Sequence, residues 1–121
     1  MNKALLCGIV QSITSEAYGE GKTLALLTIQ TKRKYQDREG QEQIEATTIP
    51  LKAFGHNASS LLKYVKRGAV ISIEARVTTK PRTSGGFFVD LSVDSYSLLG
   101  SVPATKAAPA AEFLPEEEGD L

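Results

Sequence analysis

The sequence predicts an all-β fold: a barrel of five strands with one helix between the third and the fourth strand. Apolar side chains alternate with a strand period through most of residues 1–100, polar or glycine-containing turns separate these stretches, and one short segment has a helical period. The chain has 121 residues, of which 41% are hydrophobic and 23% charged, so one ordinary globular domain is the expected organisation.

The first two strands are predicted over residues 3–10 and 23–32, on either side of a turn that contains Gly19 and Gly21. Residues 3–10 are apolar on both alternating sets of side chains, which indicates a strand covered on both faces. We expect this strand to pair with its copy in a second subunit, because that pairing also removes an exposed sheet edge. The alternative is that the chain's own helix covers the second face. Cys7, within this run, is predicted to be a buried and inert thiol.

A third strand is predicted over residues 43–54, after a polar loop at residues 33–41. Pro50 lies within this strand and lacks an N–H group, so it requires a bulge or an edge position. The segment that follows changes period and predicts a short amphipathic helix that ends before Gly68. Its apolar positions, at i, i+3, i+4 and i+7, are Ala58, Leu61, Leu62 and Val65.

The last two strands alternate between an inward and an outward set of side chains. In the fourth strand, the inward set is Ile71, Ile73, Ala75 and Val77. In the fifth strand, the inward set is Phe87, Val89, Leu91 and Val93, and the outward set is Phe88, Asp90, Ser92 and Asp94. Tyr64 and Tyr96 are assigned to packing. Five strands in this order, with one helix that can plug a barrel, predict an OB-fold rather than a sandwich.

Charge divides the chain into a body and a tail. The whole chain has 14 Lys and Arg against 14 Asp and Glu, a formal net charge of zero. Residues 1–100 hold 13 of the bases and nine of the acids, whereas residues 101–121 hold one base and five acids. The tail begins with an Ala- and Pro-rich stretch that has too little apolar bulk for a core. We therefore predict an OB-fold domain at residues 1–100 and a flexible linker with an acidic end at residues 101–121.

The composition disfavours several functional classes. A single cysteine excludes an internal disulfide bond, and Cys7 and His56 alone cannot form a zinc site, which needs about four ligands. His56 has no suitable serine and aspartate partners, so we predict that the protein is not an enzyme and that it binds no cofactor or metal. No apolar stretch approaches the roughly 20 residues of a membrane span and no signal peptide is evident, which predicts a cytoplasmic protein that does not contact a membrane.

Two groups of cations with neighbouring aromatic residues form a candidate nucleic-acid interface. The first group follows the second strand, and the other surrounds the loop before the fifth strand. Cations neutralise backbone phosphates and release counterions, while an aromatic ring offers a stacking face to a base. The alternative interpretation is a pair of solvated charged loops. The candidate residues are Lys32, Arg33, Lys34, Tyr35, Arg38, Lys80, Arg82 and Phe88.

Short motifs spaced along the chain add a further pattern. They are Asn2-Lys3-Ala4-Leu5-Leu6-Cys7-Gly8, Phe54-Gly55 before the helix, Tyr64-Val65-Lys66-Arg67-Gly68 at its end, and Ser97-Leu98-Leu99-Gly100 before the Ala/Pro stretch. In order and spacing these motifs resemble the bacterial single-stranded-DNA-binding proteins over residues 2–100, and the acidic end is similar in character to the tail of that family. The resemblance implies an OB-fold homotetramer, or a dimer, that wraps single-stranded DNA without sequence preference.

The resemblance also implies roles for individual residues. Tyr35 and Phe54 fall where the family usually has a stacking Trp and a stacking Phe. Thr48 and Arg82 fall where other stacking aromatics commonly lie, and this chain has no Trp. The tail of the family recruits replication and repair proteins and commonly ends in Pro-Phe, unlike the end of this chain. The corresponding partner-binding residues would be Phe113, Glu116, Glu117, Glu118, Asp120 and Leu121.

The leading hypothesis is therefore a non-catalytic protein that binds and protects single-stranded DNA in replication, recombination and repair. Phe54 has two interpretations, a core residue at the end of a strand or a base-stacking residue, and we adopt the second. We also expect the acidic tail to compete with DNA for the basic groove at low salt. The alternative function is a primosome-type OB-fold adaptor that binds DNA weakly, which the missing aromatic residues favour.

Overall fold

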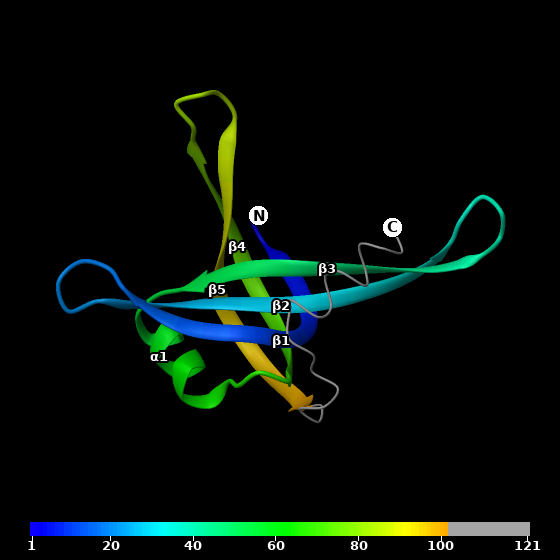
Figure 1. The fold of residues 1–121 in the computed structure, drawn as a ribbon. Coiled ribbons are helices and arrows are strands. Elements are labelled where there is room, and N and C mark those ends of the chain that lie inside the picture. The colour runs from blue at the N-terminus through cyan, green and yellow to red at the C-terminus, as the bar shows by residue number, and fades with distance from the viewer. Residues whose placement is uncertain (102–121) are drawn as a thin grey trace.

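Five strands close into a barrel, and one helix packs against it, in the computed structural model, which describes residues 1–101 (Figure 1). The elements are β1 (Ala4–Ala17), β2 (Thr23–Gln36), β3 (Glu42–Ala53), α1 (Gly55–Tyr64), β4 (Ala69–Pro81) and β5 (Phe87–Ser101). The order around the barrel is β1-β2-β3-β5-β4. The pairs are antiparallel except for β3 and β5, which meet in parallel where Lys52 lies opposite Ser92. The predicted five-stranded OB-fold barrel is confirmed.

The barrel is filled by inward-facing aliphatic side chains from its strands and by two residues of the helix. The largest fully buried side chains are those of Val10, Leu27, Ile29, Leu51, Leu61 and Ile71. The helix contacts β1, β2, β3 and β5 and places Ala58 and Leu61 in the core. Leu62 was predicted to share this apolar face, but it is 37% exposed, so the buried face of the helix is narrower than predicted.

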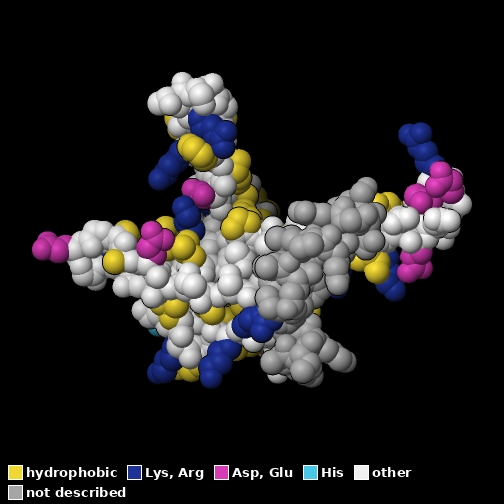
Figure 2. Space-filling view, in the orientation of Figure 1, with side chains coloured by type: hydrophobic (Ala, Val, Ile, Leu, Met, Phe, Trp, Pro, Cys, Tyr) yellow, Lys and Arg dark blue, Asp and Glu magenta, His cyan; other side chains and the backbone are white. Residues whose placement is uncertain are grey.

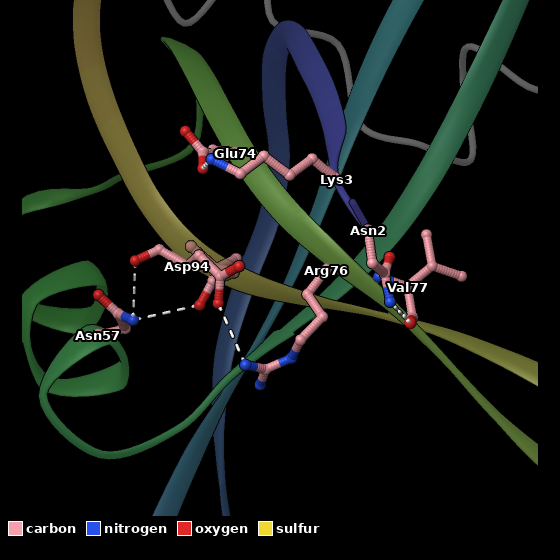
Figure 3. Close-up of polar contacts among 8 residues, drawn as sticks. Asn2, Lys3, Asn57, Glu74, Arg76, Val77 and Asp94 are labelled. Atoms are coloured by element: carbon pink, nitrogen blue, oxygen red, sulfur yellow. Dashed lines mark hydrogen bonds and ion pairs between the residues drawn. The ribbon is translucent and has the colours of Figure 1, made fainter.

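Hydrogen bonds fasten the helix and the first residues to the barrel (Figure 3). The Asn57 side-chain amide donates to two backbone carbonyl oxygens of β5, at 3.1 and 3.3 Å, and the second of these belongs to Asp94. The Asp94 carboxylate in turn forms an ion pair of 3.4 Å with Arg76 of β4. Asn2 makes two hydrogen bonds with the backbone of Val77, as donor at 2.7 Å and as acceptor at 2.9 Å. These contacts hold α1 against β5 and the N-terminal residues against β4.

Strand β1 changes its partner along its length. Residues 4–9 pair with β4, and from Ile9 onward the strand pairs with β2. The register shifts between Val10 and Ser12, and such a bulge bends a strand, which lets β1 cross from one neighbour to the other. Gly8 lies at this crossing, where a Cβ atom would come within 2.6 Å of the Gln30 carbonyl oxygen. A glycine is therefore required here by the close approach of two backbones.

The first part of β1 has an exposed face. Leu5 is 76% exposed and Cys7 is exposed too, so the prediction of a buried thiol was wrong. The chain's own helix does not cover these residues, which excludes that alternative for the second face. Among residues 1–101, no strand pairs with the edge of Ala4–Gly8 that faces away from β4. The exposed apolar face and the open edge occur on the same segment.

Three hairpins extend beyond the barrel, and they account for most differences from the predicted boundaries (Figure 1). Strand β1 continues through Ala17, so the first turn is shorter than predicted. The region 33–41, predicted as a loop, begins with four strand residues, because β2 and β3 stay paired as far as Gln36 and Glu42. Arg33 and Lys34 therefore lie on a two-stranded ribbon, and Arg38 lies on the turn that joins its strands.

The predicted inward set of β5 was wrong at its first two members. Phe87 is 64% exposed and Val89 is 65% exposed, because this part of β5 belongs to a hairpin that projects from the barrel and has no core beneath it. Ser92, predicted to point outward, is buried at the bridge to β3 that closes the barrel. Tyr96 packs against the core as predicted, whereas Tyr64 is 59% exposed and was wrongly assigned to packing.

Candidate nucleic-acid interface

The first predicted cluster lies on the outer half of the β2–β3 hairpin. The guanidinium carbon of Arg33 is 5.2 Å from the centre of the Tyr35 ring, a cation–π contact along one face of β2. Arg33 also forms an ion pair of 3.5 Å with Glu45, and Lys34 forms one of 3.6 Å with Glu42 on β3. Exposed pairs of this kind contribute about 0–1 kcal/mol, so a phosphate group can replace the carboxylate at small cost.

The turn of this hairpin is organised by Asp37. Its carboxylate accepts hydrogen bonds from the backbone N–H groups of Glu39 at 3.0 Å and Gln41 at 2.9 Å, and from the side chain of Gln43 at 3.2 Å. The bond from Gln41 is the main reason why the pKa of Asp37 lies below its usual value. Arg38 is exposed on this turn, at the far end of the hairpin from the barrel.

The second predicted cluster lies on the β4–β5 hairpin. The guanidinium carbon of Arg82 lies 4.2 Å from the centre of the Phe88 ring, and Phe88 is 53% exposed. Lys80 lies opposite Phe88 in the strand register. A cation stacked on a ring leaves the other face of that ring for a base, and the cation itself stays close enough to reach the phosphate of the same nucleotide.

Phe54 lies at the N-terminus of α1, where the barrel meets the β1–β2 turn. Its ring is 40% exposed and makes an edge-to-face contact with Tyr18, with 5.4 Å between ring centres and 83° between ring planes. Phe54 is thus not a core residue. Sequence reasoning left Tyr18 unassigned, and the available signal was an aromatic residue in the glycine-containing β1–β2 turn, one of the loops that flank the binding face of an OB-fold.

A shallow groove of about 340 Å³ lies on the barrel, and part of its wall comes from the β5 side of the β4–β5 hairpin. Its lining comes from four strands and includes Thr14, Leu26, Thr28, Pro50, Val89 and Leu91. Lys52 and Asp90 face each other across it in an ion pair of 3.6 Å. Figure 2 shows hydrophobic side chains gathered where this hairpin joins the barrel. The groove is mainly apolar and no aromatic ring lines it, but Phe54 and Phe88 lie two and one residues along the chain from its lining residues Lys52 and Val89.

The predicted site residues are therefore distributed over separate places. Tyr35 and its neighbouring cations lie on the β2–β3 hairpin, Arg82 and Phe88 on the β4–β5 hairpin, and Phe54 beside the β1–β2 turn. Thr48, half-buried on β3, has no ring to offer. His56 is exposed at the start of α1, and residues 1–101 contain no group of three or more metal-binding side chains. The predicted tail residues Phe113, Glu116, Glu117, Glu118, Asp120 and Leu121 lie outside the described part.

Comparison with models of protein families gives a match for this chain. The model of the single-strand binding protein family matches residues 1–85. The chain belongs to this family. Two curated relatives of the single-strand binding family, each named single-stranded DNA-binding protein, come from Wolinella succinogenes and Helicobacter hepaticus. The first is 28% identical over 83 residues, and the second is 26% identical over 78 residues. The alignments cover 68% and 64% of this chain, and the chain spans about half the length of each relative, 51% and 46%.

Solved structures of single-strand binding proteins share the fold. The wild-type protein from Thermus aquaticus superposes with a TM-score of 0.69 and 17% identity, over 82% of this chain and 50% of that one. A single-strand binding protein of Plasmodium falciparum in complex with single-stranded DNA gives a TM-score of 0.68 and 16% identity, over 84% and 96% of the two chains. No helix within residues 1–101 is long and apolar enough to cross a membrane.

Proposed function

We propose that the protein binds single-stranded DNA without sequence preference and performs no catalysis. The observation that carries this proposal is the position of two exposed rings next to an apolar groove: Phe54 follows the groove residue Lys52 by two positions, and Phe88 directly precedes the groove residue Val89. Phe54 contacts the half-buried Tyr18, and Phe88 contacts Arg82. Membership of the family and the names of the relatives support it. Protection of unpaired DNA in replication, recombination and repair, in the cytoplasm, is the corresponding cellular role.

The geometry suits binding without sequence preference, because aromatic stacking and phosphate neutralisation are both independent of the identity of the base. Every base has a π-face, and stacking on an aromatic side chain contributes about 1–3 kcal/mol per base. The cations of the hairpins neutralise phosphates, and the carboxylates that now pair with Arg33, Lys34 and Lys52 are displaced as phosphates bind. The dispersed clusters fit a strand that passes from one hairpin to another rather than a single compact site.

The salt dependence of binding to oligo-dT tests the function directly. The affinity for single strands falls with a slope of about −0.7 per phosphate contact in a double-logarithmic plot. With about four contacts, raising salt from about 50 to about 200 mM should weaken binding about 50-fold. Tyrosine fluorescence is a suitable signal, because the chain has four Tyr and no Trp. Unchanged fluorescence on addition of oligo-dT at low salt contradicts the proposal.

A primosome-type adaptor with weak DNA binding is the second candidate, and the lack of rings within the groove favours it. In that case residues 101–121, including the acids at 116–118, would carry the main activity by recruiting replication and repair proteins. A series of oligo-dT lengths separates the two functions, because a wrapping protein gives a defined, saturable site size and an adaptor does not.

We further propose that the protein is a homo-oligomer, a tetramer or a dimer, assembled through β1. Leu5 is 76% exposed beside the open edge of Ala4–Gly8, and a second copy could cover both features at once. Leu5→Lys should therefore shift the sedimenting species towards the monomer at micromolar concentration. Glu20→Lys, at the exposed β1–β2 turn, is the control and should leave the assembly unchanged. Wild-type protein that sediments as a monomer would contradict this assignment.

A further inference from the structure

A second cationic surface lies away from the candidate DNA interface. Lys63 at the end of α1, and Lys66 and Arg67 in the connection to β4, are all exposed, and we call these three residues the basic pole. None of the three forms an ion pair with another residue of the described part. The sequence holds no acid between Glu45 and Glu74, so nothing nearby in the chain balances their charge. Figure 2 shows Lys and Arg side chains but no Asp or Glu along the lower edge of the molecule, where α1 lies.

The basic pole contrasts with four cations of the barrel and the β2–β3 hairpin that already have a carboxylate partner. Arg33, Lys34, Lys52 and Arg76 each have a carboxylate within 4 Å. An anionic ligand that binds those residues must displace a partner, whereas a ligand of the basic pole meets cations that no described acid already neutralises. An anionic segment that binds the basic pole therefore displaces no ion pair of the described part, unlike one that binds those four residues.

A groove of about 420 Å³ lies beside these cations, and we call it the pole groove. It is lined by Tyr64, Lys66, Arg67, Ala69, Leu98 and Ser101, among others. Tyr64 is 59% exposed and Leu98 is 45% exposed, so the groove presents an apolar surface next to positive charge. Lys63 lies 5.2 Å from the centre of the Tyr64 ring. A fitting ligand combines carboxylates or phosphates with at least one apolar group.

The pole groove is also remote from the tip of the β4–β5 hairpin. Ala69 and Ser101 form the first pair of the β4–β5 ladder, and Pro81 and Phe87 form the last. The 13 residues of β4 span about 40 Å at the usual rise of a strand. The groove therefore lies at the opposite end of these strands from the Arg82–Phe88 stack.

One segment of this chain has the required chemistry and begins at the groove. Ser101, the last described residue, lines the pole groove itself. Residues 112–121 carry five acids and no base, together with Phe113, Leu114 and Leu121. The ten residues at 102–111 can span up to about 35 Å when extended, which is enough to bring this acidic segment back to the groove.

We propose that the pole groove docks the acidic segment of residues 112–121. An apolar side chain of the segment packs against Tyr64 and Leu98, and its carboxylates lie beside the basic pole. The segment comes from the same chain or from a neighbouring subunit. This assignment places the acidic tail away from the apolar groove that Lys52 and Asp90 line, and it does not depend on the proposed DNA binding.

Nuclear magnetic resonance of the full-length chain tests the proposal. Backbone amide shifts are compared between the wild type and a variant with Glu116→Gln, Glu117→Gln, Glu118→Gln and Asp120→Asn. We expect the largest differences at Tyr64, Lys66, Arg67 and Gly100, and little change in the hairpin residues 80–88. The differences should shrink at least threefold when salt is raised from about 20 to about 300 mM, because exposed charges are then screened beyond a few ångströms.

Two control variants make the result specific. Glu16→Gln with Glu20→Gln neutralises two exposed acids of the β1–β2 hairpin and should leave the pole groove amides unchanged. Lys66→Ala with Arg67→Ala should abolish the response to neutralisation of the tail. Shift differences that appear at β2–β3 and β4–β5 instead, or nowhere, overturn the proposal. It is also overturned if oligo-dT shifts the pole groove amides and neutralising the tail does not, since the groove would then be part of a path for nucleic acid.

Discussion

Leu61→Ala is expected to lower the free energy of unfolding by about 2–5 kcal/mol, whereas Leu62→Ala should lower it by less than about 1 kcal/mol. The two leucines are neighbours on α1, but Leu61 is fully buried and Leu62 is 37% exposed. Truncation of Leu61 leaves a cavity among core side chains that are held by the closed barrel and cannot easily move to fill it. Urea unfolding followed by circular dichroism measures both values on the same scale.

The pair also tests which face of the helix plugs the barrel. The i, i+3, i+4 spacing allows either leucine to point inward, and only the structure distinguishes them. Equal losses from the two variants would show that α1 is rotated about its axis relative to the arrangement described above. The slope of free energy against urea concentration should be unchanged in both variants if the native barrel is retained.

Strands that bury one face in the barrel core were predicted correctly from the sequence. The alternation of Ile71, Ile73 and Ala75 is typical of a half-buried strand, and these three side chains are buried. The helix was predicted between the correct strands, because a change of period from two to 3.6 is a local signal. Hydrophobic periodicity indicates which side chains face a core, so it predicts an element correctly wherever that element packs on the core.

Periodicity did not predict the hairpins that project from the barrel. Phe87 and Val89 alternate as core residues do, but no element covers them, and periodicity cannot show where a hairpin leaves the barrel. In the β2–β3 hairpin the polar residues were interpreted as a loop, although they form a ladder stabilised by cross-strand pairs such as Arg33 with Glu45. Cys7, like Phe87, was expected to be buried because it lies in an apolar pattern. Such a pattern does not show whether another part of the same chain covers the side chain.

The candidate site was predicted in its composition but not in its arrangement. The cations and the rings of both hairpins were identified from local sequence, and the contact of Arg82 with Phe88 joins residues only six positions apart. The contact of Tyr18 with Phe54 joins residues 36 positions apart, on a turn and at a helix start, so only the closed barrel brings them together. The pole groove has the same origin, because α1 and the end of β5 meet there.

Phe54→Ala is expected to weaken binding to oligo-dT about 5- to 150-fold, which corresponds to the loss of about 1–3 kcal/mol of stacking on one base. The ring is 40% exposed and caps no helix group with its side chain, so the fold should survive this change with little loss of stability. Anisotropy of a labelled oligonucleotide measures the affinity, because this signal stays valid in variants that lack a tyrosine. Tyr64→Ala is the matched control: it removes an aromatic ring exposed to 59% at the pole groove and should change the affinity less than twofold.

Tyr18→Ala decides whether the two rings act as one platform. The edge-to-face contact positions the Phe54 ring, and such contacts contribute about 0.5–1.5 kcal/mol beyond the buried area. If one base stacks on the pair, the double variant should lose less affinity than the sum of the two single variants, with a coupling above about 0.5 kcal/mol. Additive losses would mean that each ring stacks on a base of its own. No loss of affinity from Phe54→Ala would exclude this aromatic pair from the DNA path. The β2–β3 and β4–β5 hairpins would then be the remaining candidates for binding the strand.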